Sequence, residues 1–241
     1  SSNTAVGTTA LYANTTGASN TAVGKAALDA NTTGFYNVAV GENALGANVD
    51  GGRNTAVGYA SLAAQDPASA IDTYNTAVGF HAGNALTTGT NNTLIGGLAG
   101  DAITTADDTV AIGYLALSTN TTADDNTAVG SSALTANTSG RINTAVGKGS
   151  MAANTEGTDN SAFGGLTLDA NTTGDNNTAL GYAALTANTT ADNNTSVGAG
   201  SLAANTTGAL NVAVGSISLD ANTTGTYGVA IGHSALGSNT T

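Results

Sequence analysis

The chain has 241 residues and a formal net charge of -12, and only 8% of its residues are charged, so it is neither an ordinary enzyme domain nor a solvated disordered polymer. Its four lysines and arginines argue against nucleic acid and anionic membranes as partners, because affinity for phosphate backbones needs clustered basic residues. The absence of cysteine removes disulfides and thiolate metal sites, and the apolar stretches are far shorter than the about 20 residues that insert into a bilayer.

The chain is a repeat from its first residues onward. The string Asn-Thr-Ala-Val-Gly or a close variant occurs fourteen times, and the glycines that end it, the repeat glycines, are 17 residues apart in every case but one. The exception is the interval of 21 from Gly58 to Gly79, where segment 65–72 contains the single proline. We expect one repeat array over residues 1–241 with a four-residue insertion in the loop near 65–72. Because whole repeats run from end to end, we also expect a piece of a longer protein. The repeat glycines are Gly7, Gly24, Gly41, Gly58, Gly79, Gly96, Gly113, Gly130, Gly147, Gly164, Gly181, Gly198, Gly215 and Gly232.

Each repeat is too short for two packed helices, and threonine, valine, asparagine and glycine are poor helix formers. Short Thr-Ala-Val segments bounded by glycine and asparagine suit strands and tight corners. The sequence therefore predicts an all-β fold, a parallel β-solenoid of fourteen 17-residue coils in which every residue stacks on its counterpart in the next coil.

Two columns of apolar residues are predicted to line the core. The valine column is the residue before each repeat glycine, and the leucine column is the residue four positions after it. The leucine column is interrupted at Gly83 and Gly100, and these two repeats carry Leu86 and Ile103 three residues later, which indicates a local change of register in the same core. The predicted core residues are Val6, Val23, Val40, Val57, Val78, Val129 and Val146, with Leu11, Leu28, Leu134 and Leu185.

The residue before the valine column is also small or apolar, and it forms an alanine column. Since neighbouring residues of a strand point to opposite faces, both faces of this strand are predicted to be dry. A second buried face implies another chain, most simply three solenoids around one axis. A single exposed alanine needs no such explanation, so plain exposure is the alternative. The predicted face between chains is Ala5, Ala22, Ala128, Ala145 and Ala179.

The array N-T-A-V-G, A-L, A-N-T-T-G resembles the head repeats of trimeric autotransporter adhesins and the similar repeats of phage and bacterial tail-fibre-like proteins, over essentially the whole chain. This resemblance implies a left-handed parallel β-roll in a homotrimer displayed outside the cell or on a virion. The 17-residue period differs from the shorter repeat that is commonest in adhesin heads.

Polar columns offer several kinds of chemistry. Two asparagine columns, represented by Asn20 and Asn31, are predicted to be structural ladders of side-chain amides. The threonine column that includes Thr15 and Thr138 could match an ice lattice, although Asp50 and Glu156 interrupt the column beside it and corner chemistry also explains threonine.

Acidic residues gather near corners, as at Asp107 and Asp124. They could hold Ca²⁺ opportunistically, but their spacing is not that of a calcium loop, and a solvated acidic edge is the simpler interpretation. His81 and His233 are too far apart in the stack to share a metal ion within one chain. No catalytic constellation and no cofactor motif is found in the sequence.

Aromatic residues recur just after the repeat glycine. Tyr59, Phe80, Tyr114 and Tyr182, with His233, could stack on sugars or could cover the neighbouring coil. Taken together, the sequence predicts a non-enzymatic structural and adhesive rod of an extracellular or virion-borne trimeric fibre. Its expected partners are copies of itself and a host-surface protein or glycan. An ice-binding solenoid is the alternative.

Overall fold

The structure is a computed structural model that describes residues 2–241. These residues form an all-β solenoid without helices, and they contain one three-residue strand per coil. The chain divides into two compact units, unit 1 (Ser1–Asp124) and unit 2 (Asp125–Thr241), which share the same coil design. The strands of unit 1 are β1 (Thr4–Val6), β2 (Thr21–Val23), β3 (Val38–Val40), β4 (Thr55–Val57), β5 (Thr76–Val78), β6 (Thr93–Ile95) and β7 (Val110–Ile112). The strands of unit 2 are β8 (Thr127–Val129), β9 (Thr144–Val146), β10 (Ser161–Phe163), β11 (Thr178–Leu180), β12 (Thr195–Val197), β13 (Val212–Val214) and β14 (Val229–Ile231).

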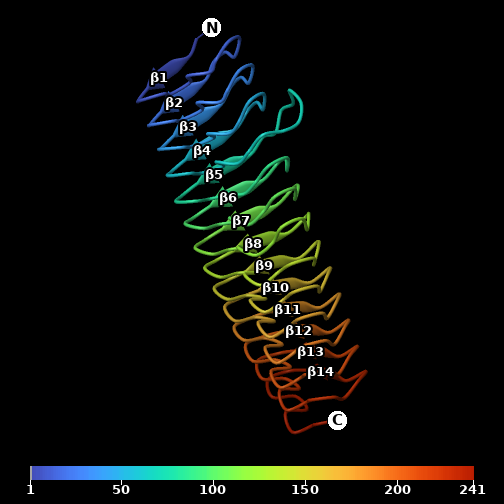
Figure 1. Ribbon diagram of the computed structural model, residues 1–241. Helices are drawn as coiled ribbons and strands as arrows, with labels where there is room; N and C mark the ends of the chain where they lie inside the picture. Colours follow the sequence, from blue (N-terminus) through green and yellow to red (C-terminus); the bar gives the residue numbers. More distant parts are fainter. Residues whose placement is uncertain (1) are drawn as a thin grey trace. The chain divides into compact units, whose positions relative to one another are not determined.

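Within each unit, every strand pairs in parallel with the strand of the next coil (Figure 1). The register places identical repeat positions side by side, so Ala22 pairs with Ala39 and Ala145 with Ala162. The longer interval does not change this register, because Ala56 of β4 pairs with Ala77 of β5. The predicted stacking of each residue on its counterpart is therefore confirmed within both units.

The repeat glycine turns the chain after each strand. Gly24 has φ of +139°, a backbone conformation that residues with a side chain rarely adopt, and a Cβ atom there would collide with the carbonyl of Gly41 in the next coil. Glycine is thus required both by its dihedral angle and by the close approach of successive coils.

The two faces of the strand are the reverse of the prediction. The alanine column points into the solenoid, and Ala22, Ala128, Ala145 and Ala179 are fully buried within their own chain, while Ala5 of the first coil is exposed. These alanines cannot form a face between chains, because their own coil already covers them.

The valine column points outward, so the prediction that it lines the core is wrong. Val6 is 58% exposed and Val78 is 36% exposed, and Val23, Val40, Val57, Val129 and Val146 are half-buried. The physical reason is the narrow interior of the coil, in which the leucine column already fills the volume and leaves room only for a methyl group opposite it.

The leucine column lies in the core as predicted. Leu28, Leu134 and Leu185 are fully buried, and Leu11 of the first coil is half-buried. These leucines have positive φ, for example 50° at Leu28. A left-handed residue costs about 1–2 kcal/mol, and burial of a leucine side chain contributes about 1.5–3 kcal/mol. Burial therefore offsets the strain in this column.

The two coils without a core leucine are repacked around Leu94. Leu94 stands in the alanine column, and a Cβ atom added at Gly83 would lie 2.6 Å from its Cδ1. A Cβ atom at Gly100 would lie 2.8 Å from Cδ2 of Leu94 and from Cδ1 of Ile103. Leu86, Leu94 and Ile103 are fully buried. Leu86 and Ile103 thus join the core as expected, but the predicted change of register is wrong, because Leu94 pairs with Ala77 and Ala111 in the same register as the other coils and supplies the missing volume from the strand.

Candidate interaction surfaces

The outer face of the strands consists of two columns without charge. The first and third residues of each strand point outward, and neither column contains an aspartate, glutamate, lysine or arginine. The third residue is valine, isoleucine, leucine or phenylalanine, with 41% exposure at Phe163 and 49% at Leu180. The first residue is threonine in most strands, and the hydroxyls of Thr21, Thr144 and Thr178 make no hydrogen bond to any described residue. Each unit therefore presents an apolar stripe beside a column of mostly hydroxyl side chains, which valine interrupts at Val38, Val110, Val212 and Val229.

The asparagine columns are internal ladders, as predicted. Oδ1 of Asn20 accepts the backbone N–H of Asn37 at 2.9 Å, and Nδ2 of Asn20 donates to the carbonyl of Gly34 at 2.8 Å. In the second column, Nδ2 of Asn31 donates to Oδ1 of Asn14 at 2.9 Å. These bonds tie the coils together, and Asn20, Asn31 and Asn37 are buried within the chain.

The threonine column at the corner is also occupied within the chain. The hydroxyl of Thr15 donates to the carbonyl of Thr32 at 3.0 Å, and that of Thr138 donates to the carbonyl of Thr155 at 2.9 Å. This is the column from which the sequence suggested an ice-binding face.

A third kind of position, the corner column, lies five residues before each repeat glycine and has positive φ in every coil from Ser19 to Tyr227. Asparagine and aspartate tolerate this left-handed conformation, and they occupy it at Asn91, Asp108, Asp159 and other corners. Apart from Ser19, bulky side chains occupy the remaining corners, and none of them is buried in the core to offset its cost of about 1–3 kcal/mol. The bulky residues are Tyr36, Arg53, Tyr74, Ile142, Leu210 and Tyr227.

Three of these bulky corners are consecutive and form the Arg53 cluster, which is Phe35, Tyr36, Arg53, Asp72 and Tyr74. The guanidinium carbon of Arg53 lies 5.0 Å from the ring centre of Tyr36, 5.8 Å from that of Tyr74 and 5.9 Å from that of Phe35. Nε of Arg53 donates to Oδ2 of Asp72 at 2.8 Å, and this hydrogen bond raises the pKa of Arg53. The hydroxyl of Tyr74 donates to the same oxygen at 3.2 Å.

The sequence analysis missed this cluster. Its signal was available, because the register of the repeat places Tyr36, Arg53 and Tyr74 in one column of three successive coils. The end of the inserted loop completes it, since Asp72 bridges to Gly52 and the amide of Gly52 donates to the carbonyl of Ile71 at 3.0 Å.

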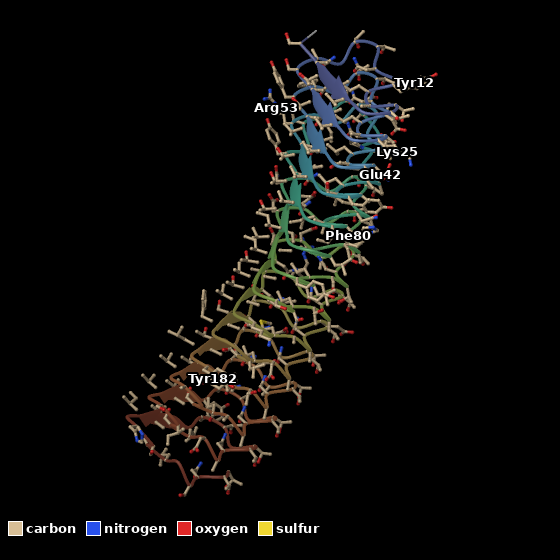
Figure 2. The ribbon with its side chains drawn as sticks, turned by 90° about the vertical axis from the view of Figure 1, so that its left-hand side faces the viewer. Tyr12, Lys25, Glu42, Arg53, Phe80 and Tyr182 are labelled. Carbon is tan, nitrogen blue, oxygen red and sulfur yellow. The ribbon has the colours of Figure 1, made fainter. Side chains whose placement is uncertain are left out.

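An aromatic ladder lies at the other end of the strands of unit 1, on the opposite side from Arg53 in Figure 2. The rings of Tyr59 and Phe80 stack at 5.5 Å, and His81 stacks on Phe80 at 4.3 Å. Tyr59 and Phe80 are the aromatic residues that the sequence placed after the repeat glycine, and both are exposed. Beside them, Lys25 and Glu42 form an exposed ion pair at 2.8 Å, whose hydrogen bond raises the pKa of Lys25.

The acidic corner residues act mainly as acceptors for the neighbouring coil. Oδ1 of Asp107 accepts the backbone N–H of Thr90 at 2.6 Å, and Oδ1 of Asp192 accepts that of Asp175 at 2.8 Å. Among residues 2–241, no group of three acidic or histidine side chains is placed to hold a metal ion.

Tyr114, Tyr182 and His233 lie exposed at separate corners. Burial raises the pKa of Asp101, and the electrostatic interaction with the nearby His81 partly opposes this rise.

No pocket is found in the part of the chain that the structure describes, and its helix-free fold contains no candidate membrane-spanning helix. Comparisons with protein-family models and with curated proteins find no match. The function must therefore be argued from the surfaces themselves.

Proposed function

We propose that this chain is a structural and adhesive segment of an extracellular trimeric fibre, on a cell or virion surface, in which copies of the chain pack through their outer strand faces. The observation that carries the proposal is the valine column, an uncharged apolar stripe on a chain of net charge -12. Single exposed valines are ordinary, but a continuous apolar stripe marks an interaction surface.

The choice of a second copy as the partner follows from the stripe's repeated geometry. Each coil offers the same side chains at the same spacing, so two copies can match along the whole length of a unit, and homo-oligomers use such self-complementary patches. The number three comes from the resemblance to adhesin heads. The corrected interface is the valine column, because the alanine column is inside.

The assembly test uses paired outward substitutions in unit 2. Val129→Asp with Val146→Asp places charges on the stripe, and Thr173→Asp with Thr207→Asp adds the same charge at exposed corners as the control. Light scattering should give three times the chain mass of 23.0 kDa for the wild type and the control, and monomers for the stripe variant.

Circular dichroism should show that all three proteins keep their β structure, because Val129 and Val146 point outward. A monomeric wild type, or a stripe variant with the wild-type mass, would contradict the proposed assembly.

An ice-binding solenoid is a second candidate because strand threonines such as Thr144 and Thr178 present unpartnered hydroxyls at the same strand position. Ice binding would use the same outer face as the fibre contact, so one protein sample can distinguish the two proposed functions. A monomer that facets growing ice crystals at micromolar concentration supports ice binding, whereas a trimer that leaves ice unfaceted supports the fibre.

A further inference from the structure

We propose that the Arg53 cluster binds carboxylate-bearing sugars, so that unit 1 contains a glycan-recognition site built on the corner column. The inference deepens the adhesive part of the proposed function and rests on it for its biological meaning. Its members Tyr36, Arg53 and Tyr74 are exposed, belong to residue types that dominate binding surfaces, and lie at corners where the backbone disfavours such residues.

The backbone shows that these side chains are not corner fillers. Tyr36, Arg53 and Tyr74 have φ of 58°, 63° and 52°, in a column where Asn91 and Asp108 adopt the same conformation with less strain. Tyr36 is 55% exposed and Tyr74 is 53% exposed. Core packing therefore does not account for two tyrosines and an arginine in succession, and unfavourable backbone geometry of this kind points to a role at the surface.

The guanidinium of Arg53 is held in one orientation with its outer edge open. Asp72 binds Nε, and the rings of Tyr36 and Tyr74 lie on either side of the guanidinium in the preceding and following coils. Neither terminal nitrogen of Arg53 donates a hydrogen bond to any residue in the described range 2–241. Two parallel N–H groups on a fixed arginine match the two oxygens of a carboxylate.

The aromatic rings of Tyr36 and Tyr74 favour a carboxylate that is part of a sugar. The next residues of the corner column are Ser19 and Asn91, which are small, so about half of each tyrosine ring remains open to a ligand. An aromatic face packs against the C–H face of a pyranose ring, and its hydroxyl can bond to the sugar. The chain's net charge of -12 repels simple anions, so binding of an acid here needs both the arginine and the rings.

The cluster could instead serve only to fasten the inserted loop, through Arg53 and Asp72. Tyr36 separates the two roles, because its ring packs on Arg53 while its hydroxyl makes no bond to the loop. Tyr36→Ala therefore leaves the Arg53–Asp72 ion pair in place and removes only a stacking surface.

The test is a saturation-transfer NMR titration with methyl β-glucuronide and methyl β-glucoside, which differ only at C6, a carboxylate in the first and a hydroxymethyl group in the second. The wild type should bind the glucuronide at least about tenfold more tightly than the glucoside, as one good charged bidentate contact predicts. Arg53→Gln should abolish that difference, and Tyr36→Ala should weaken binding of both sugars.

Two matched controls come from unit 2. Arg141→Gln removes an arginine that is 53% exposed, against 42% for Arg53, and Tyr227→Ala removes an exposed corner tyrosine, and neither should change sugar binding. Equal affinity for the two sugars, no binding of either, or an Arg53→Gln affinity equal to the wild type would overturn the inference.

Light scattering on the same samples separates the two proposals. Loss of sugar selectivity with the trimeric mass retained counts against the sugar site alone, and a monomer that still distinguishes the two sugars counts against the fibre alone.

Discussion

The coils around β5 and β6 in unit 1 and the coils around β9 to β12 in unit 2 reach the same backbone with different interiors. In unit 2 each coil has a small residue on the strand and a large core residue at the leucine position, as in Ala145 with Met151 and Ala162 with Leu168. In unit 1 the order is inverted, since Leu94 is on the strand and Gly83 and Gly100 occupy the leucine column. The comparison teaches that the coil requires a fixed core volume and is indifferent to which wall supplies it.

The asparagine ladders differ in the same way. In unit 2 the second ladder runs unbroken from Asn137 to Asn222 through amide bonds of 2.9–3.3 Å. In unit 1 it stops at Asn48, because the next position is Gln65 and the two after it are the core residues Leu86 and Ile103. Oδ1 of Asn48 and both amide atoms of Gln65 are buried without partners. In unit 1 the interruption therefore affects hydrogen bonds in the second asparagine ladder as well as packing in the core.

The largest expected effect comes from removing the inverted core side chain. Leu94→Ala should lower the free energy of unfolding by about 2–5 kcal/mol, because Gly83 and Gly100 cannot fill the cavity. Urea unfolding followed by circular dichroism measures the loss. The double variant Leu94→Ala with Gly100→Leu should recover part of it by moving the large side chain to the leucine position, where Cδ1 of Ile103, 2.8 Å from a Cβ atom at Gly100, must shift to make room. Additive losses in the double variant would show that the two positions do not share one volume.

A smaller effect is expected in the ladder of unit 2. Asn171→Ala leaves Oδ1 of Asn154 without a donor, at a cost of about 1–3 kcal/mol, while the carbonyl of Gly174 keeps its hydrogen bond from Nδ2 of Asn160. Gln65→Asn in unit 1 should instead raise the free energy of unfolding by about 0.5–1.5 kcal/mol. The new side chain offers Oδ1 of Asn48 the amide donor that the ladder uses elsewhere. Thermal unfolding of both variants tests the pair, and a destabilising Gln65→Asn would mean that the longer side chain fits the enlarged coil better.

The smallest effect concerns Asp101. Its raised pKa means that the folded chain binds this proton more tightly than the unfolded chain, so the associated stability is present below the ordinary value of 3.8 and is lost as the pH rises through the folded pKa. Asp101→Asn should therefore raise the melting temperature at about pH 7, by less than about 2 °C because the residue is only half-buried, and should leave it unchanged at about pH 3. Asp169 occupies the same column in unit 2, where its Oδ1 accepts the hydroxyl of Thr186, and Asp169→Asn should not stabilise at either pH.

The fold could be predicted from the sequence because its period is strict, and every residue of a coil is fixed by its distance from the repeat glycine. The inward and outward faces of a three-residue strand could not, because alternation states that Ala145 and Val146 point to opposite sides without stating which side is inside. That choice depends on how much room Leu134 and Met151 leave, which is a three-dimensional volume. In the Arg53 cluster the column of Tyr36, Arg53 and Tyr74 could be predicted from the repeat. The contact of Asp72 could not, because Asp72 comes from the inserted loop, and a loop of irregular length has no repeat position from which to predict its contacts.

The constant strand register also has a consequence for the evolution of the gene. Because Ala56 and Ala77 pair as Ala145 and Ala162 do, any two coils present the same edge to each other. Unequal recombination between two repeats of the gene therefore adds or deletes complete coils without disturbing the pairing on either side. Selection can then adjust the number of coils, and the side chains at the corners, as independent traits.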